Sequence, residues 1–184
     1  FNFTGSGWAI LWTGNHGILK NCKFINNTAD KWGGAVYWGG TNGAINDSTF
    51  INNTAASGGG ILWNGVNGIL SGSNFTDNFA KGNGGGIYWW KANGTLTNCI
   101  FINNAADSIG GSIVWNGAKG AISSSDFISN SANNGGAVSW EGIYGILTDC
   151  NFINNNAKGN GGGVYWIAND GILSNSNFIN NKAQ

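Results

Sequence analysis

Short runs of alternating apolar and polar residues recur at a nearly fixed interval along the whole chain. Val36–Trp38 and Ile87–Trp89 are typical runs, in which the first and third residues share one face because successive strand side chains point to opposite sides. The runs are rich in β-branched and aromatic residues and are bounded by Gly and Asn, as strands are. No stretch keeps the 3.6-residue period of an amphipathic helix. The pattern therefore predicts an all-β chain.

The interval defines a tandem repeat of 25 or 26 residues. The same residue type returns at the same place in each unit, which is the sequence signature of a solenoid, whose units contact mainly their neighbours. The Phe column is Phe24, Phe50, Phe75, Phe101, Phe127, Phe152 and Phe178. The Asn column is Asn27, Asn53, Asn78, Asn104, Asn130, Asn155 and Asn181. The Trp column is Trp12, Trp38, Trp63, Trp89, Trp115, Trp140 and Trp166.

These columns predict one domain over residues 1–184, a right-handed, single-stranded parallel β-helix of about seven turns with three short strands per turn. The strands are expected around Leu19, around Cys22–Ile25 and around Ala35–Trp38. Stacked turns then form three parallel sheets, in which identical side chains lie about 4.8 Å apart. The expected boundaries are a partial turn at 1–16, full turns at 17–42, 43–67, 68–93, 94–119, 120–144 and 145–170, and a partial turn at 171–184.

The columns have different expected roles. The Phe and Trp columns should fill two flanks of the interior, where stacked aromatic rings gain about 0.5–1.5 kcal/mol per pair beyond their burial. The Asn column should lie at a turn, because Asn tolerates the left-handed conformation and identical amides can hydrogen-bond from turn to turn. A Gly-Gly pair such as Gly33–Gly34 should form a second bend, where a side chain would clash.

One row of strand residues has the opposite parity and should face outward. Together with Trp32 and Trp90, this row is expected to form a moderately apolar stripe, and a contiguous apolar patch suggests an interface or a ligand contact. The row is Tyr37, Leu62, Tyr88, Val114, Ser139 and Tyr165.

The repeat units resemble those of two families. The sequences Phe-Ile-Asn-Asn at 24–27 and Gly-Gly-Ala-Val at 33–36 are similar to the paired FxxN and GGA[ILV] motifs of chlamydial polymorphic outer-membrane proteins. The fuller pattern at 84–89, 94–99 and 101–104 looks like the β-helix repeats of adhesin-like proteins of methanogenic archaea. The resemblance implies a secreted or cell-surface right-handed β-helix.

The charge pattern excludes two classes of partner. The net charge is zero, only 9% of residues are charged and there is no Arg, so the chain lacks the basic surface that binds nucleic acid. No apolar run approaches the roughly 20 residues that a membrane-spanning helix needs, so no membrane insertion is expected. Because the chain starts at Phe1 without a signal-peptide pattern, a processed form or an excised segment is expected.

We expect no catalytic, cofactor or metal site. Asp126 and Asp149 are the best acidic pair, on adjacent turns and roughly 5–8 Å apart, within the range of paired glycosidase carboxylates. The chain has no Arg base, and His16, its single histidine, has no nucleophile pattern beside it. The alternative to a non-enzyme is a carbohydrate-binding or polysaccharide-degrading β-helix protein. The acids are scattered over the repeat at Asp30, Asp47, Asp77, Asp107, Asp126, Glu141, Asp149 and Asp170.

The cysteines and the glycosylation sequences follow from the same repeat. Cys22, Cys99 and Cys150 share one column with serines, and the closest two are two turns apart, or about 10 Å. A disulfide needs Cα atoms within roughly 7 Å, so all three are expected to be free thiols.

Acceptor sequences for N-glycosylation occur at Asn2, Asn26, Asn46, Asn52, Asn74 and Asn93.

These features favour an extracellular structural or adhesive element, either a cell-surface shaft or a fibre subunit. Phe1 and Gln184 fall at nearly the same angular position after seven turns, and no capping element is evident at either end. The expected partners are copies of the same chain stacked head to tail, with an axial rise of about 34 Å, or neighbouring repeats of a longer chain. Surface glycans are a further expected partner.

Overall fold

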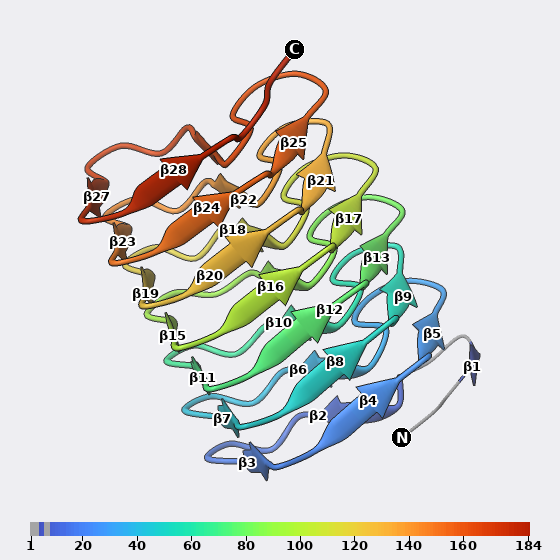
Figure 1. Cartoon of the computed structure of the whole chain (residues 1–184). Coiled ribbons are helices and arrows are strands. Elements are labelled where there is room, and N and C mark those ends of the chain that lie inside the picture. The colour runs from blue at the N-terminus through green and yellow to red at the C-terminus, as the bar shows by residue number, and fades with distance from the viewer. Residues whose placement is uncertain (1–3, 6–7) are drawn as a thin grey trace.

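The computed structural model describes residues 4–5 and 8–184, and over these residues the chain consists of strands and turns without a helix. The strands stack in parallel into about seven turns of a β-helix, which Figure 1 shows most clearly for β4 (Lys23–Ile25), β8 (Thr49–Ile51) and the strands above them. The predicted fold class, an all-β parallel β-helix, is confirmed, and the winding is consistent with the expected right-handed sense.

The strands form four parallel sheets, A to D. Sheet A contains β1 (Thr4–Gly5), β5 (Thr28–Ala29), β9 (Thr54–Ala55), β13 (Phe79–Ala80), β17 (Ala105–Ala106), β21 (Ser131–Ala132) and β25 (Asn156–Ala157). Sheet B contains β2 (Ile10–Trp12), β6 (Val36–Trp38), β10 (Ile61–Trp63), β14 (Ile87–Trp89), β18 (Ile113–Trp115), β22 (Val138–Trp140) and β26 (Val164–Trp166).

Sheets C and D have the same construction. Sheet C contains β3 (Ile18–Lys20), β7 (Ala44–Asn46), β11 (Ile69–Ser71), β15 (Thr95–Thr97), β19 (Ala121–Ser123), β23 (Ile146–Thr148) and β27 (Ile172–Ser174). Sheet D contains β4, β8, β12 (Asn74–Thr76), β16 (Ile100–Ile102), β20 (Asp126–Ile128), β24 (Asn151–Ile153) and β28 (Asn177–Ile179).

Each full turn therefore has four strands, and the expected three strands per turn are wrong by one. The additional strand is the two-residue strand of sheet A, exemplified by β5. Two residues are too few to show the apolar and polar alternation that identifies a strand in the sequence. Only the stacking of the turns, with Thr28 paired to Thr54 in parallel, shows that this segment is a strand.

A residue in the left-handed conformation separates each strand from the next. In one turn these residues are His16, Asn21, Asn26 and Gly33, all with φ between 55° and 59°. The expected turn at the Asn column is present, but the left-handed residue is Asn26 and not its buried neighbour Asn27, which corrects the prediction. An exposed residue such as Asn26 takes the strained angle, which leaves the next amide free to point inward.

The Gly-Gly pair makes the bend that leads into sheet B. Gly33 has a φ of 59°, and a Cβ on Gly34 would collide with the Gly59 carbonyl oxygen of the next turn. The two glycines therefore serve different needs, one a left-handed angle and the other the close approach of two turns.

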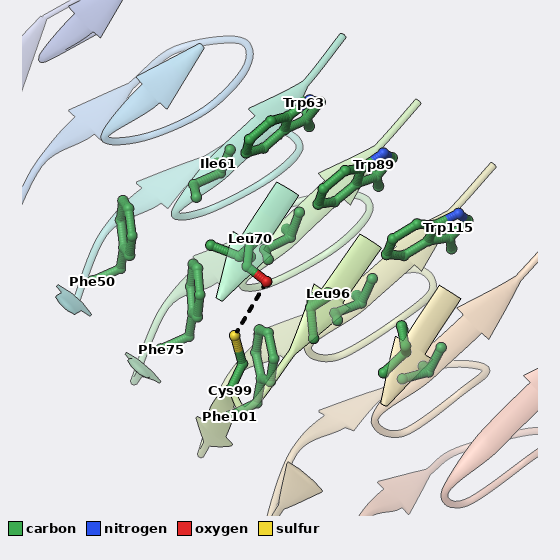
Figure 2. Close-up of a cluster of buried hydrophobic side chains, with 14 of the residues drawn as sticks. Phe50, Ile61, Trp63, Leu70, Phe75, Trp89, Leu96, Cys99, Phe101 and Trp115 are labelled. Atoms are coloured by element: carbon green, nitrogen blue, oxygen red, sulfur yellow. Dashed lines mark hydrogen bonds between the residues drawn. The ribbon is translucent and has the colours of Figure 1, made fainter. Parts of the chain in front are cut away.

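The core consists of side-chain ladders, because each strand pairs with the same positions one turn away. Phe50 pairs with Phe75, and Trp63 with Trp89. Successive Phe rings lie 4.6–5.0 Å apart and successive indoles 4.5–5.2 Å apart, nearly parallel in both columns. Figure 2 shows the two ladders on opposite sides of the interior, with Ile61, Leu70 and Leu96 between them.

The Asn column forms a buried amide ladder between sheets D and A. Asn78 Oδ1 accepts hydrogen bonds from the backbone N–H and the side-chain amide of Asn53 at 3.0 and 2.9 Å. Asn78 Nδ2 donates to the carbonyl of Phe50 and to Asn104 Oδ1, both at 2.9 Å. Each interior asparagine thus satisfies the turn before it and is satisfied by the turn after it.

Replacement of Asn78 by Ala should break this ladder in the middle. The substitution leaves two buried donors of Asn53 without an acceptor, so we expect a loss of about 2–4 kcal/mol in the free energy of unfolding. Guanidinium denaturation followed by circular dichroism measures the change. Asn74→Ala removes an exposed amide from the outer face of sheet D and should change stability by less than about 0.5 kcal/mol. Equal effects of the two substitutions would contradict a structural role of the ladder.

Candidate functional site

The row expected to face outward on sheet B points away from the core, but only part of it reaches solvent. Its three tyrosines are half-buried, whereas Leu62, Val114 and Ser139 are fully covered. The predicted continuous apolar stripe is therefore wrong at these three positions. Leu62 lies in register between Tyr37 on one side and Tyr88 on the other. Large neighbouring side chains cover this position, and the sequence parity does not reveal them.

Five aromatic side chains form one cluster, the aromatic cluster, on the outer face of sheet B: Trp8, Trp32, Tyr37, Tyr88 and Trp90. The Trp32 ring centroid lies 6.5 Å from that of Tyr37 and 6.4 Å from that of Trp90. Tyr88 stacks on Trp90 at 5.8 Å, and Trp8 is tilted against Tyr37 at 5.1 Å. Since Trp32 precedes β6 and Trp90 follows β14, their contact bridges the intervening strand β10.

Polar side chains hold the two tyrosine hydroxyls of the cluster. Asn64 Nδ2 donates to Tyr37 Oη at 2.9 Å, and Asn116 Nδ2 donates to Tyr88 Oη at 3.3 Å. Burial raises the pKa of Tyr88, the Glu141 carboxylate raises it further, and the Asn116 hydrogen bond opposes both. The phenol therefore stays protonated at neutral pH and keeps its O–H as a donor.

Trp8, Asn64 and Asn116 are members or supports of the cluster that the sequence reasoning missed. Trp8 occupies the position of the repeat that holds the second glycine of the Gly-Gly pair in later turns, such as Gly34. A Trp in an otherwise regular glycine column is the sequence signal that marks Trp8 as unusual. The two asparagines follow the Trp column directly, and nothing in their spacing indicates a tyrosine partner one turn earlier.

The C-terminal end of the β-helix presents an open edge. Phe178 and Leu173 belong to interior columns, yet each is 46% exposed, because the structure places no further turn on them. Phe24, in the first full turn, is fully buried. A surface depression at the open edge is lined by Trp166, Ala168, Asn169, Asp170, Gly171 and Leu173.

The structure does not bring the predicted acidic pair together in a shared hydrogen bond. Asp126 Oδ1 accepts from Asn151 Nδ2 at 2.7 Å, and Asp149 Oδ2 accepts from Thr148 Oγ1 at 3.1 Å. His16 lies at an exposed corner. Among residues 4–5 and 8–184, no three His, Cys, Asp or Glu side chains gather where they could hold a metal ion. The same part of the chain has no helix of the length and hydropathy needed to cross a membrane.

The three cysteines are free thiols in the structure. Each thiol donates to the backbone carbonyl two residues earlier, at 3.2–3.3 Å, as the serines of the same column do. Cys99 is buried beside Phe101, and Figure 2 shows its thiol directed at the Leu70 carbonyl, 4.0 Å away. Burial raises the pKa of Cys99 to about 12 and that of Cys150 to about 11. Such thiols suit a packing role and not a nucleophilic one.

The glycosylation sequences lie on the outside of the β-helix where the structure describes them. Asn26, Asn52, Asn74 and Asn93 are exposed, and Asn46 is half-buried. Asn2 lies outside the described residues. Asn52 Nδ2 donates to Asn26 Oδ1 at 2.9 Å, so these two acceptor amides lie side by side on the surface. Their occupancy stays a hypothesis, which the intact mass of the natural protein tests.

Comparison with known proteins supports the chlamydial part of the resemblance. A family model of the Chlamydia polymorphic membrane protein repeat matches residues 21–37, 47–62 and 72–88. Each matched stretch begins at the left-handed corner before sheet D and ends on the outward row of sheet B. No curated protein and no solved structure matches the chain. The similarity to methanogen adhesin-like proteins therefore stays a prediction.

The fold and these repeats together define a class of protein. The chain is a parallel β-solenoid that carries repeats similar to those of the Chlamydia polymorphic membrane protein family, and it fits a surface-associated, adhesin-like β-helix.

The buried thiols should make stability fall at high pH. Folded Cys99 and Cys150 keep their protons to about pH 12 and 11, whereas unfolded thiols ionise from the ordinary pKa of 9.0. The unfolded state therefore binds fewer protons above pH 9, and the stabilising effect, complete below pH 9, is lost as pH rises toward 12. Guanidinium unfolding at pH 8 and pH 10.5 should show a smaller decrease for Cys99→Ser than for the wild type. An identical decrease would contradict the assignment.

Proposed function

We propose that this chain is part of an extracellular, cell-surface β-helix shaft of the adhesin-like kind, and that its open C-terminal edge takes up the first turn of a second copy. The observation that carries the proposal is the exposure of interior-column side chains in the last turn, above all Phe178 and Leu173. In the preceding turns, the side chains of the same two columns, from Phe50 to Phe152 and from Ile45 to Leu147, are completely buried. A further parallel turn is the cover that matches the edge in both shape and hydrogen bonding.

The columns supply the register for such a stack. With β2 of the incoming copy paired to β26, its β3 and β4 meet β27 and β28. Phe178 and Leu173 then come into the same columns as the incoming Phe24 and Leu19, both of which are already buried in their own chain. Covering a half-exposed Leu or Phe contributes on the order of 1 kcal/mol each, in addition to the new backbone hydrogen bonds.

Contacts at both ends have to give way before a copy can dock in this register. The groups that bury Phe24 and Leu19 in the incoming copy must move, and so must the segment that lies next to β25. Lys182 already pairs with Asn156 of β25. The incoming β1 would take that place. It belongs to sheet A and directly precedes β2, so when β2 lies on β26, β1 lies on β25. Docking therefore displaces the segment around Lys182, and this displacement opposes the stack. Neighbouring repeats of a longer chain could cover the same edge without such competition.

Electron microscopy and X-ray scattering of the purified chain test the stack. We expect filaments with an axial repeat of about 34 Å, which is seven turns at about 4.8 Å each. Leu173→Lys should abolish them, because it places a charge in the interface that forms at the edge. Ile69→Lys is the matched control, since Ile69 is comparably exposed but lies on the outer face of sheet C. Removal of residues 182–184 should speed assembly.

A monodisperse monomer without filaments, for the wild type and for the chain lacking residues 182–184, would exclude head-to-tail stacking. The shaft role would then depend on neighbouring repeats. Filaments that persist in Leu173→Lys would show that another surface drives assembly.

We further propose that the chain is not an enzyme. The support is the placement of the acids: Asp126 and Asp149 are each hydrogen-bonded to an uncharged neighbour, and the ion pair of Lys20 with Asp47, at 3.8 Å, is exposed. These acids lack the close carboxylate pairing of a glycosidase site.

Incubation with plant and microbial polysaccharides tests this second proposal. We expect no new reducing ends and no unsaturated products above those of a heat-denatured sample. Turnover that is lost in Asp126→Asn or Asp149→Asn but kept in Asp107→Asn would overturn the proposal and locate the catalytic pair.

A further inference from the structure

We propose that the aromatic cluster on the outer face of sheet B is a binding site for uncharged glycan chains of pyranose sugars. The cluster combines two features that such ligands require, namely exposed aromatic faces and fixed hydroxyl groups beside them. It lies on the turns from β2 to β14 and makes no use of the open C-terminal edge, so the proposal does not depend on head-to-tail stacking.

The two exposed indoles form the platform of the site. Trp32 and Trp90 are each 41% exposed, although both contact other rings of the cluster. Their planes meet at 64°, so the pair presents two ring faces in different directions. An aromatic ring carries negative charge on its face, which attracts the weakly positive C–H groups of a pyranose ring. Three turns separate β2 from β14, so the cluster extends about 14 Å along the axis and offers room for more than one sugar ring.

The polar groups of the cluster are oriented for hydroxyl ligands. The Tyr37 and Tyr88 oxygens each accept a hydrogen bond from an asparagine amide, which leaves each phenol O–H available to donate. A sugar hydroxyl accepts such a hydrogen bond, so it can satisfy both phenols.

Other occupants fit the cluster less well. Charged residues of both signs lie close to the cluster. Lys31 and Lys91 adjoin Trp32 and Trp90 in sequence, Asp30 precedes Lys31, and Glu141 lies near Tyr88. Neither an anion nor a cation is therefore favoured as the ligand. The strands beneath, from β6 to β14, are paired on both sides, so a peptide cannot add to them as a further strand. Leu62 is already covered, so the cluster offers no apolar groove for the side of a helix.

Binding to insoluble and soluble polysaccharides tests the site. The probes are cellulose, chitin, xylan and mannan, in pull-down experiments and affinity electrophoresis of the whole chain. We expect retention on at least one of them, and Trp32→Ala and Trp90→Ala should each weaken it by about tenfold or more, because each removes an exposed stacking face. Ile69→Ala, which removes an exposed apolar side chain from sheet C, should bind as the wild type does.

Circular dichroism of each variant establishes that the β-helix is intact, and Trp90→Phe provides a second test that keeps an aromatic face and should restore most of the binding. Absence of wild-type binding to all four polysaccharides would overturn the proposal. So would equal retention of Trp32→Ala, Trp90→Ala and the wild type. If Trp32→Ala abolishes self-association of the chain, the cluster is a contact between copies instead. If Leu173→Lys loses filaments but still binds polysaccharide, the glycan site stands independently of stacking.

Discussion

The structure depends on one constraint, the parallel pairing of every position with the same position one turn away. The backbone N–H of Gly34 donates to Gly58 O, and that of Gly59 donates to Gly84 O, so the alignment of turns is fixed by hydrogen bonds throughout the bends as well as in the strands. A side chain in this arrangement has its own counterpart as its nearest neighbour along the axis. The repeat in the sequence is therefore a consequence of the fold: a residue type is kept in a column because it packs against itself.

The buried asparagines show how strong this constraint is. A single amide buried among phenylalanines would lose its hydrogen bonds to water without replacement, which costs about 1–3 kcal/mol for each unpaired group. In the ladder, Asn104 donates to Asn130 and accepts from Asn78, so the cost disappears for the interior turns. The Phe column is likewise covered in the interior, whereas Phe178 in the last turn is 46% exposed. Length is therefore stabilising, and an uncovered last turn is the least satisfied part of the β-helix.

The sequence predicted those features that repeat in columns and failed where a feature depends on the space between columns. The Phe, Asn and Trp ladders follow from residue spacing alone. The strand at Thr28–Ala29 did not, because two residues carry no period, and the left-handed corner was assigned to Asn27 when it belongs to Asn26. The burial of Leu62 was also missed. Leu62 lies in register between Tyr37 and Tyr88, on a face where Trp32 and Trp90, 58 positions apart, also meet, and such a contact lies outside any single repeat unit.

The same distinction separates the parts of the molecule that determine the fold from those available for recognition. Interior columns cannot vary without breaking a ladder, so they are nearly identical from turn to turn and cannot distinguish one part of the β-helix from another. Outward positions are free of this constraint: the row that holds Tyr37 and Tyr88 holds Ser139 in a later turn without any change in pairing. Specific contacts of a β-helix with a ligand must therefore come from outward residues in particular turns. The aromatic cluster is the strongest such departure among the described residues, and it lies on the early turns, away from the C-terminal edge.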